Sequence, residues 1–267
     1  MFKDITLGQY FPGDSVIHRL DPRTKLILMM AYIVAVFLVK DMWLFLFTAL
    51  YAVGVTLISG VPLSYLLRSI KPLKFILIFM FIINLLVTST GDVLVDWWII
   101  RITTGGVRQA VFITIRLILL VSGTSLMTLT TTPISLTDGL ERLMMPLSRF
   151  KFPAHELAMM MTIALRFIPT LLEEADKITK AQTARGADFE SGGIIERAKS
   201  MVPVLVPLFV SAFRRADELA MAMESRCYHG GEGRTRMTVL KYRQRDAWAF
   251  MSMALLIGLT LVLQAVL

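Results

Sequence analysis

Cysteine and histidine are scarce in this sequence. Cys227 is the only cysteine among 267 residues, so an intrachain disulfide framework is excluded. The three histidines, His18, His155 and His229, lie far apart along the chain. His155 begins a zinc-protease-like His-Glu pair, but Met159 stands where the second histidine would have to be. The sequence therefore predicts no metal site.

A phosphate-binding loop is also missing. The glycine-rich stretch 230–233 has neither the lysine nor the preceding strand pattern that such a loop requires. Cys227 has no base near it in sequence, which leaves a nucleophilic role without support. We therefore predict no catalytic residue and no cofactor bound by this chain itself.

Apolar residues, in contrast, are abundant. They make up 55% of the chain, and the mean hydropathy is +0.66. Apolar runs of this length are typical of proteins that cross a lipid bilayer. The formal net charge is +8. In a membrane protein an excess of Lys and Arg reports orientation, so the charge does not indicate a nucleic-acid partner.

Five apolar segments are predicted to cross the membrane. They are residues 26–39, 43–58, 73–88, 107–128 and 247–267. The first two would together form a helix of about 50 Å, too long for one crossing of a roughly 30 Å core. The charged pair Lys40-Asp41 separates them, so we predict a tight hairpin with two slightly short arms. No cleavage pattern follows the first segment, which is expected to be retained.

The positions of Lys and Arg predict the orientation. Residues 129–246 hold 17 of the 28 basic residues, whereas the 88–106 connection holds only Arg101. Because loops left in the cytoplasm are enriched in Lys and Arg, the N-terminus and residues 129–246 are predicted to be cytoplasmic and the C-terminus extracellular. The expected domains are a four-span membrane domain (1–128), a cytoplasmic coupling domain (129–246) and a last transmembrane helix (247–267).

Two amphipathic helices are predicted within the coupling domain. Apolar side chains recur at helical spacing from Leu157 to Ile178, with polar side chains on the opposite face. A second run from Leu205 to Met223 repeats the pattern. The alternative is that the two runs form a transmembrane hairpin, for which their apolar stretches are short. The predicted fold class is thus an all-α membrane protein with about five spans plus long amphipathic helices.

Arg116 lies in the middle of the fourth predicted span. A charge at bilayer depth costs at least about 2.5 kcal/mol, so this side chain should face the protein interior or another subunit. We predict a structural role for this intramembrane charge, with Asn84 of the third span as its partner. At the start of the first span, Asp21 is a good helix cap and Pro22 suits the first helical position.

The two amphipathic helices end in similar tripeptides. These are Ala184-Arg185-Gly186 and Ser225-Arg226-Cys227. A cation at a helix C-terminus is favoured by the helix dipole, and simple capping worth less than about 1 kcal/mol is one interpretation. The other is docking, because two equal arginine tips suggest two equal partners and Arg offers a planar fork for carboxylates.

Three stretches resemble one known family. They are residues 18–25 (His-Arg-Leu-Asp-Pro-Arg-Thr-Lys), 166–188 and 203–226, which include both arginine tips. The chain resembles the transmembrane (T) component of energy-coupling factor (ECF) transporters, the EcfT or CbiQ-like family of ABC-type importers. The likeness covers nearly the whole chain.

The resemblance implies a non-catalytic scaffold in a bacterial cell membrane. Such a subunit holds a separate membrane substrate-binding (S) subunit and stands on two cytoplasmic ATPases, which bind ATP and Mg. Arg185 and Arg226 would contact the ATPases, flanked by Ala184, Gly186, Ser225 and Cys227. The second tip departs from the usual Ala-Arg-Gly. Cysteine tolerates positive φ less well than glycine, so the second helix is expected to end differently. The implied cargo is a vitamin or a transition-metal ion.

Two other functions compete with this one. A membrane enzyme with an interfacial active site would need clustered acidic residues or histidines on facing helices. The acidic residues Glu173, Glu174 and Asp176 are close together. However, Lys177 lies four residues after Glu173 and Lys180 four residues after Asp176, which is typical of pairs that stabilise a helix. A permease acting alone would show internal repeats and interrupted spans, and the sequence has neither.

Overall fold

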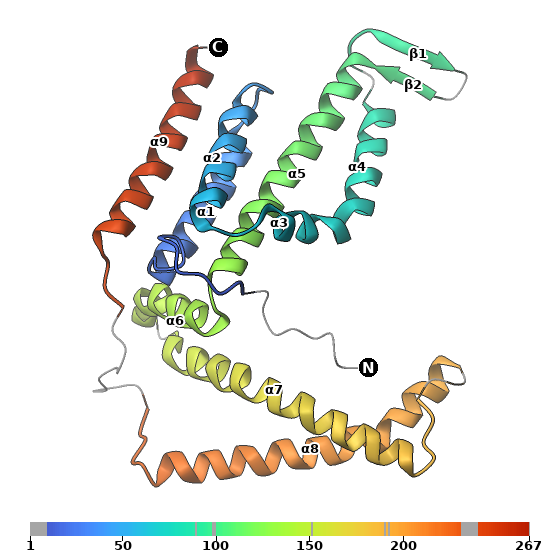
Figure 1. Cartoon of the computed structure of the whole chain (residues 1–267), viewed down its shortest axis with the longest axis vertical. Helices are drawn as coiled ribbons and strands as arrows, with labels where there is room; N and C mark the ends of the chain where they lie inside the picture. Colours follow the sequence, from blue (N-terminus) through green and yellow to red (C-terminus); the bar gives the residue numbers. More distant parts are fainter. Residues whose placement is uncertain are drawn as a thin grey trace. The chain divides into compact units, whose positions relative to one another are not determined.

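The structure, a computed structural model, describes residues 10–88, 90–97, 100–150, 152–189, 191, 193–230 and 240–266, which are mostly helical (Figure 1). The α-helices are α1 Pro22–Leu38, α2 Leu44–Ser59, α3 Leu63–Ile70, α4 Lys74–Val87, α5 Thr104–Thr130, α6 Pro133–Met144, α7 Ala154–Ala184, α8 Ile194–Glu224 and α9 Gln244–Val266. Two 3-10 helices, η1 Lys71–Leu73 and η2 Met145–Phe150, and an antiparallel hairpin of β1 Val93–Trp97 and β2 Ile100–Thr103 complete the described elements.

Within the described residues, four stretches are long and apolar enough to cross a membrane. They are Leu63–Val87, Thr104–Thr130, Ala154–Ala184 and Gln244–Val266. The predicted hairpin arms correspond to α1, of 17 residues, and α2, of 16 residues, both short as expected. The predicted all-α membrane fold is confirmed. Because α7 also qualifies by length and composition, its assignment as a cytoplasmic amphipathic helix stays a prediction.

The chain packs as two compact units, and the boundary between them falls within α6. We call Gly8–Gly139 together with Leu240–Leu267 the bundle unit, and Leu140–Val239 the paired-helix unit. In the bundle unit, α1 packs against α5 and α9, while α4 packs against α5. The predicted division at residues 128 and 246 concerns topology across a membrane and stays a prediction.

The core of the bundle unit forms around α1. Ala35 and Val36 of α1 are fully buried among side chains of α5 and α9, including Leu119 and Leu256. Tyr32 lies against Gly123 of α5, where a Cβ would come within 2.4 Å of the tyrosine ring. Glycine at this position therefore allows α1 and α5 to approach closely.

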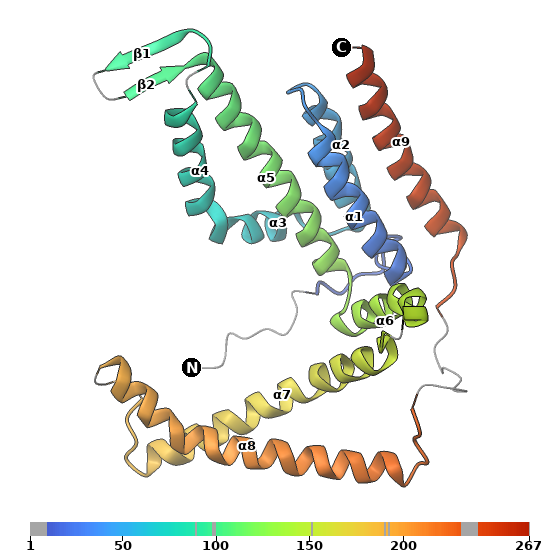
Figure 2. The ribbon, with the colours of Figure 1, turned by 180° about the vertical axis from the view of Figure 1, so that it is seen from behind.

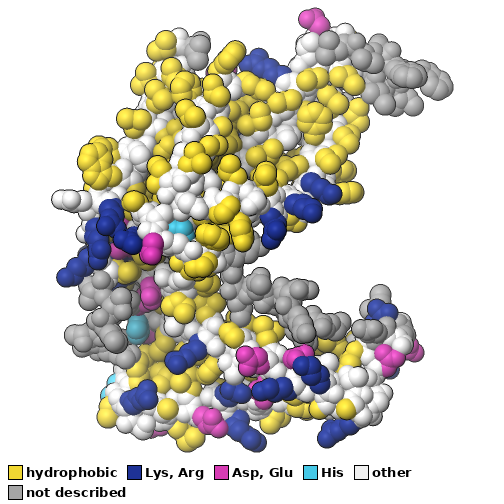
Figure 3. Space-filling view, viewed as in Figure 1, with side chains coloured by type: hydrophobic (Ala, Val, Ile, Leu, Met, Phe, Trp, Pro, Cys, Tyr) yellow, Lys and Arg dark blue, Asp and Glu magenta, His cyan; other side chains and the backbone are white. Residues whose placement is uncertain are grey.

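The outer surface of the bundle unit is apolar. In the view of Figure 3, most of its exposed side chains are hydrophobic, and Lys and Arg gather toward the end where α1 and α9 begin. Helix α4 buries none of its residues, and Phe75 is 79% exposed. Surfaces of this kind are covered by lipid or by another membrane chain.

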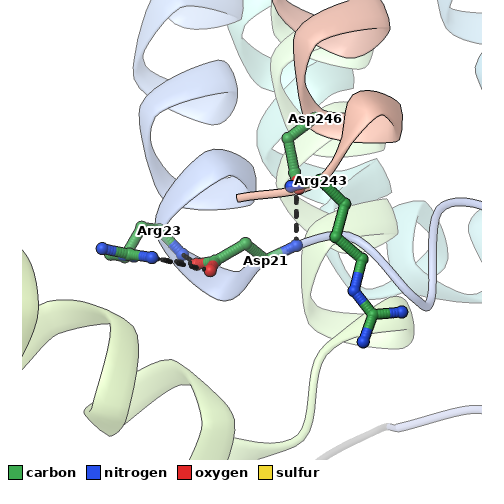
Figure 4. Close-up of polar contacts among 4 residues, drawn as sticks. All are labelled: Asp21, Arg23, Arg243 and Asp246. Carbon is green, nitrogen blue, oxygen red and sulfur yellow. Dashed lines mark hydrogen bonds and ion pairs between the residues drawn. The ribbon is translucent and has the colours of Figure 1, made fainter. Parts of the chain in front are cut away.

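The starts of α1 and α9 are joined by a hydrogen bond (Figure 4). Asp21 caps α1 by accepting from the Arg23 backbone N–H at 2.9 Å, as predicted, and Pro22 is the first helical residue. The backbone N–H of Asp21 donates to Asp246 at 2.9 Å, and Asp246 also accepts from the backbone N–H of Arg243. One carboxylate of α9 thus ties the beginnings of both helices at the same end of the unit.

The charge of Asp21 is favoured by its neighbours. Burial alone would raise the pKa of its carboxyl, but hydrogen bonds from the side chain and backbone of Arg23 outweigh this, and the net shift is downward. The hydrogen bonds from Arg23 therefore favour the ionised form of the carboxyl that caps α1.

The far end of α1 is capped from two other helices. The last carbonyls of a helix lack partners within it and carry partial negative charge. Arg116 of α5 donates to the Val39 carbonyl at 2.7 Å, and Gln264 of α9 donates to the Leu38 carbonyl at 2.7 Å. The guanidinium of Arg116 also lies 4.7 Å from the centre of the Phe112 ring.

Arg116 therefore faces the protein interior as predicted, but its predicted partner is wrong. The amide of Asn84 donates to the Met80 carbonyl in its own helix at 2.8 Å, so it is satisfied locally. The cation instead binds a helix end, where a backbone carbonyl would otherwise have no donor.

Candidate functional site

The two helices that carry the predicted tips form the paired-helix unit. Helices α7 and α8 pack against one another, with Ala175 and Val204 buried at the contact. Helix α8 bends part-way along its length (Figure 2), consistent with Pro203 and Pro207 inside it, each of which removes a backbone donor.

A polar network crosses between the two helices. Glu174 of α7 accepts hydrogen bonds from Ser211 and from the guanidinium of Arg215, the latter at 2.9 Å. Hydrogen bonds to a charged group are stronger than neutral ones. The network was missed at the sequence level, although Ser211 and Arg215 lie four residues apart and share one helix face. It fixes how α7 and α8 sit against each other.

The end of α7 forms a Schellman motif. Gly186 has φ +90°, its N–H donates to the Thr183 carbonyl at 2.9 Å, and the N–H of Ala187 donates to the Gln182 carbonyl at 3.0 Å. This pair of bonds satisfies carbonyls that would otherwise have no donor. Arg185 is the residue directly before the left-handed position.

The end of α8 forms the same motif. Cys227 has φ +55°, its N–H donates to the Glu224 carbonyl at 2.8 Å, and the N–H of Tyr228 donates to the Met223 carbonyl at 3.0 Å. The expectation that the second helix ends differently is therefore wrong: cysteine adopts the left-handed conformation that glycine adopts in α7. Arg226, like Arg185, directly precedes the left-handed residue.

Both tips are open to contact. All six predicted docking residues, 184–186 and 225–227, are exposed. In the part of the chain that the structure describes, neither Arg185 nor Arg226 has an ion-pair partner. Each tip therefore presents a guanidinium at a rigid helix end, able to donate two parallel hydrogen bonds to a carboxylate.

The acidic residues and the histidine that an interfacial enzyme would require form hydrogen bonds or ion pairs with other side chains. Asp176 pairs with Lys180 at 2.5 Å across one helical turn, as predicted, and Glu174 belongs to the α7–α8 network. His155 lies 3.0 Å from Glu141, not beside another histidine. Among the described residues, no group of three or more His, Cys, Asp or Glu side chains is placed to hold a metal ion.

Comparison with known proteins decides the family. The family model described as "CbiQ: Cobalt transport protein" matches residues 13–237. Three similar relatives are all named energy-coupling factor transporter transmembrane protein EcfT. They come from Thermosediminibacter oceani (55% identical, over 95% of this chain and 96% of the relative), Clostridium kluyveri (50%, over 98% and 97%) and Bacillus subtilis (47%, over 99% and 100%).

The chain belongs to the EcfT family. It is a transmembrane component of an energy-coupling factor transporter, as the sequence motifs predicted. Both arginine tips fall within the residues that the family model matches.

Proposed function

We propose that this EcfT-family chain is the scaffold that couples two cytoplasmic ATPases to a membrane substrate-binding subunit. The observation that carries the proposal is the pair of matched tips: two helices end in the same Schellman motif with an exposed arginine at the same place. One tip would dock on each ATPase. The ATPases would bind ATP and Mg, so that this chain itself holds no cofactor and catalyses no reaction.

The α7–α8 network supports a route for the motion. When ATP binding closes the ATPases, the two tips are displaced relative to each other. Glu174, Ser211 and Arg215 hold the helices together where they meet, so the displacement is passed along α7 and α8 instead of being lost in sliding. The membrane helices then receive it and reorient or release the substrate-binding subunit.

The proposed setting is a bacterial cell membrane. We infer that the N-terminus and residues 129–246 are cytoplasmic and the C-terminus extracellular, from the 17 basic residues in that segment. The cargo would be a vitamin or a transition-metal ion, and the substrate-binding subunit would choose it. The family model's description names cobalt transport, which agrees with the second of these classes.

Removing the arginines tests the docking. A charge-assisted contact in a desolvated pocket loses roughly 2–5 kcal/mol when one partner is truncated, about 30-fold to several thousand-fold in affinity. We expect Arg185→Ala or Arg226→Ala to weaken recovery of the ATPases with a tagged chain, and the double variant to abolish it, as for bivalent attachment. Arg197→Ala, an exposed arginine at the start of α8, serves as the matched control.

The capping interpretation predicts a different result for ATPase recovery. Loss of a cap costs less than about 1 kcal/mol per site and leaves the ATPases attached. If the double variant retains both ATPases and normal uptake, docking through the arginines is excluded and only capping remains.

A further inference from the structure

A cavity of about 290 Å³ opens within the bundle unit, between α1, α2, α5 and α9. Its deep wall is apolar and includes Leu28, Ala52, Leu126 and Met253. We call it the bundle cavity. It is separate from the arginine tips, which lie in the other unit, and the proposed coupling role does not use it.

The lysine, tyrosine, serine and threonine side chains in the wall of the bundle cavity already have hydrogen-bond partners. The hydroxyl of Tyr32 donates to the Leu119 carbonyl at 3.1 Å, and Tyr51 and Ser252 hydrogen-bond to each other at 3.3 Å. Lys25 donates to the Thr130 carbonyl at 2.7 Å. A polar ligand would find few free partners here, whereas a hydrocarbon chain needs none.

The rim of the cavity faces outward. Val16, Ile58 and Trp248 contribute to the lining and are 51%, 61% and 67% exposed. Tryptophan is enriched where the hydrocarbon core of a membrane meets the headgroups. An opening in this zone gives the acyl chains of the bilayer direct access to the cavity.

Positive charge is in excess at the same end. Arg245 lines the cavity, and no hydrogen bond or ion pair joins it to another described residue. The guanidinium of Arg243 points away from the Asp21–Asp246 contact (Figure 4). Both carboxylates there already accept hydrogen bonds, Asp21 from Arg23 and Asp246 from backbone N–H groups. The arginines are therefore left for an anion from outside the chain.

We propose that the bundle cavity binds one acyl chain of an anionic phospholipid, with its phosphate held by Arg245. The apolar depth accepts the chain, and the basic mouth selects the headgroup, as basic pockets at membrane surfaces do. The lipid fills the space between α1, α2, α5 and α9 and so becomes part of the packing of the bundle unit.

Lipid binding to the assembled transporter in mild detergent tests this. Native mass spectrometry would count phospholipids retained while phosphatidylglycerol or phosphatidylcholine is titrated. We expect one tightly held phosphatidylglycerol per EcfT-family chain. Ala249→Phe, which fills the cavity, should remove it, and Arg245→Gln should lower the affinity for phosphatidylglycerol about fivefold and that for phosphatidylcholine less. The controls are Leu255→Phe, at a 70% exposed position of α9, and Arg108→Gln.

Several results would overturn the proposal. Retention of the lipid in Ala249→Phe would do so, and so would binding that does not distinguish the two lipids. Absence of lipid from the assembled transporter, with binding only to the isolated chain, would show that a protein partner covers the opening instead. If Ala249→Phe does not fold, the wild-type transporter can be crosslinked with phosphatidylglycerol that carries a photoreactive acyl chain. We expect crosslinks to the cavity residues of α1, α5 and α9. Crosslinks confined to the exposed helix α4 would contradict the proposed site.

Discussion

The left-handed position of each tip is filled by a different residue. Gly186 takes positive φ without steric cost, whereas Cys227 is the only non-glycine residue with positive φ among those described. For a residue with a Cβ this conformation costs roughly 1–2 kcal/mol. The second tip therefore carries backbone strain that the first does not.

Replacing the cysteine should relieve that strain. We expect Cys227→Gly to stabilise the paired-helix unit by up to about 1 kcal/mol, since the added freedom of the unfolded chain offsets part of the gain. The apparent Tm in detergent should rise by a few degrees. Ser225→Gly, at φ −61° in the last turn, is the matched control and should lower Tm. A lower Tm for Cys227→Gly would mean that the sulfur makes a stabilising contact.

Arg116 gives a second prediction at the scale of one residue. Arg116→Gln removes the donor to the Val39 carbonyl and should cost about 1–3 kcal/mol, because a buried acceptor is left without a partner. The measurement is abundance in the membrane and Tm. Arg108→Gln is the control, since its pair with Asp41 is long, at 3.8 Å, and exposed, and should contribute less than about 1 kcal/mol. Normal complexes that lose uptake of a single substrate would instead place Arg116 on a substrate path.

Residue-level interactions were predictable where they are local. The Asp21 cap could be read because its acceptor and donor lie two residues apart. Its contact with Asp246 spans 225 positions and leaves no pattern in the sequence. The partner of Arg116 could not be found either, because it is a backbone carbonyl, which every residue has.

Among the elements, the α7–α8 network can be tested separately from the tips. Glu174→Gln keeps the side-chain volume but removes the negative charge of the carboxylate, which accepts hydrogen bonds from Ser211 and Arg215. We expect it to lower transport per ATP hydrolysed by a few-fold while both ATPases stay bound. The free energy of pairing between α7 and α8 should fall by about 1 kcal/mol, below the 1.5–3 kcal/mol typical of charged hydrogen bonds, because the Glu174 and Arg215 side chains are 25% and 36% exposed.

The control for this variant is Asp176→Asn. Its pair with Lys180 joins side chains 42% and 71% exposed on one helix, worth about 0.3–0.5 kcal/mol. Uptake and ATPase activity should be near normal. If Glu174→Gln transports normally, the network does not carry the motion, and if it loses the ATPases, the tips depend on the helix pairing.

Long periodic elements were found from sequence and short ones were not. The α1–α2 hairpin followed from two apolar runs broken by a charged pair, and α5 and α9 from their length. Helix α3 and the hairpin of β1 and β2 lie in segments for which the sequence predicts only connections between spans. Eight helical residues or five strand residues give too few repeats of either period to stand out.

At the scale of the whole molecule, the direction of the helices constrains topology. The hydrogen bond from Asp21 to Asp246 places the starts of α1 and α9 at the same end of the bundle unit. A chain that enters α1 from the cytoplasm therefore also enters α9 from the cytoplasm and ends outside. The orientation itself rests on the distribution of Lys and Arg.

The single cysteine offers a direct test of that orientation. Cys227 is exposed in this chain and lies in the segment predicted to be cytoplasmic, beside the proposed ATPase contact of Arg226. In cells that express this chain without the ATPases, a membrane-impermeant maleimide should therefore label it in inside-out vesicles and not in intact cells. In a Cys227→Ser background, Trp43→Cys, at a 76% exposed position between α1 and α2, should give the opposite pattern.

Ser191→Cys in the same background separates the two interpretations of α7 and α8. If the pair is cytoplasmic, Ser191→Cys labels only in inside-out vesicles, whereas labelling in intact cells would show that α7 and α8 form a transmembrane hairpin. Labelling of Cys227 and Trp43→Cys from the same side would overturn the topology altogether.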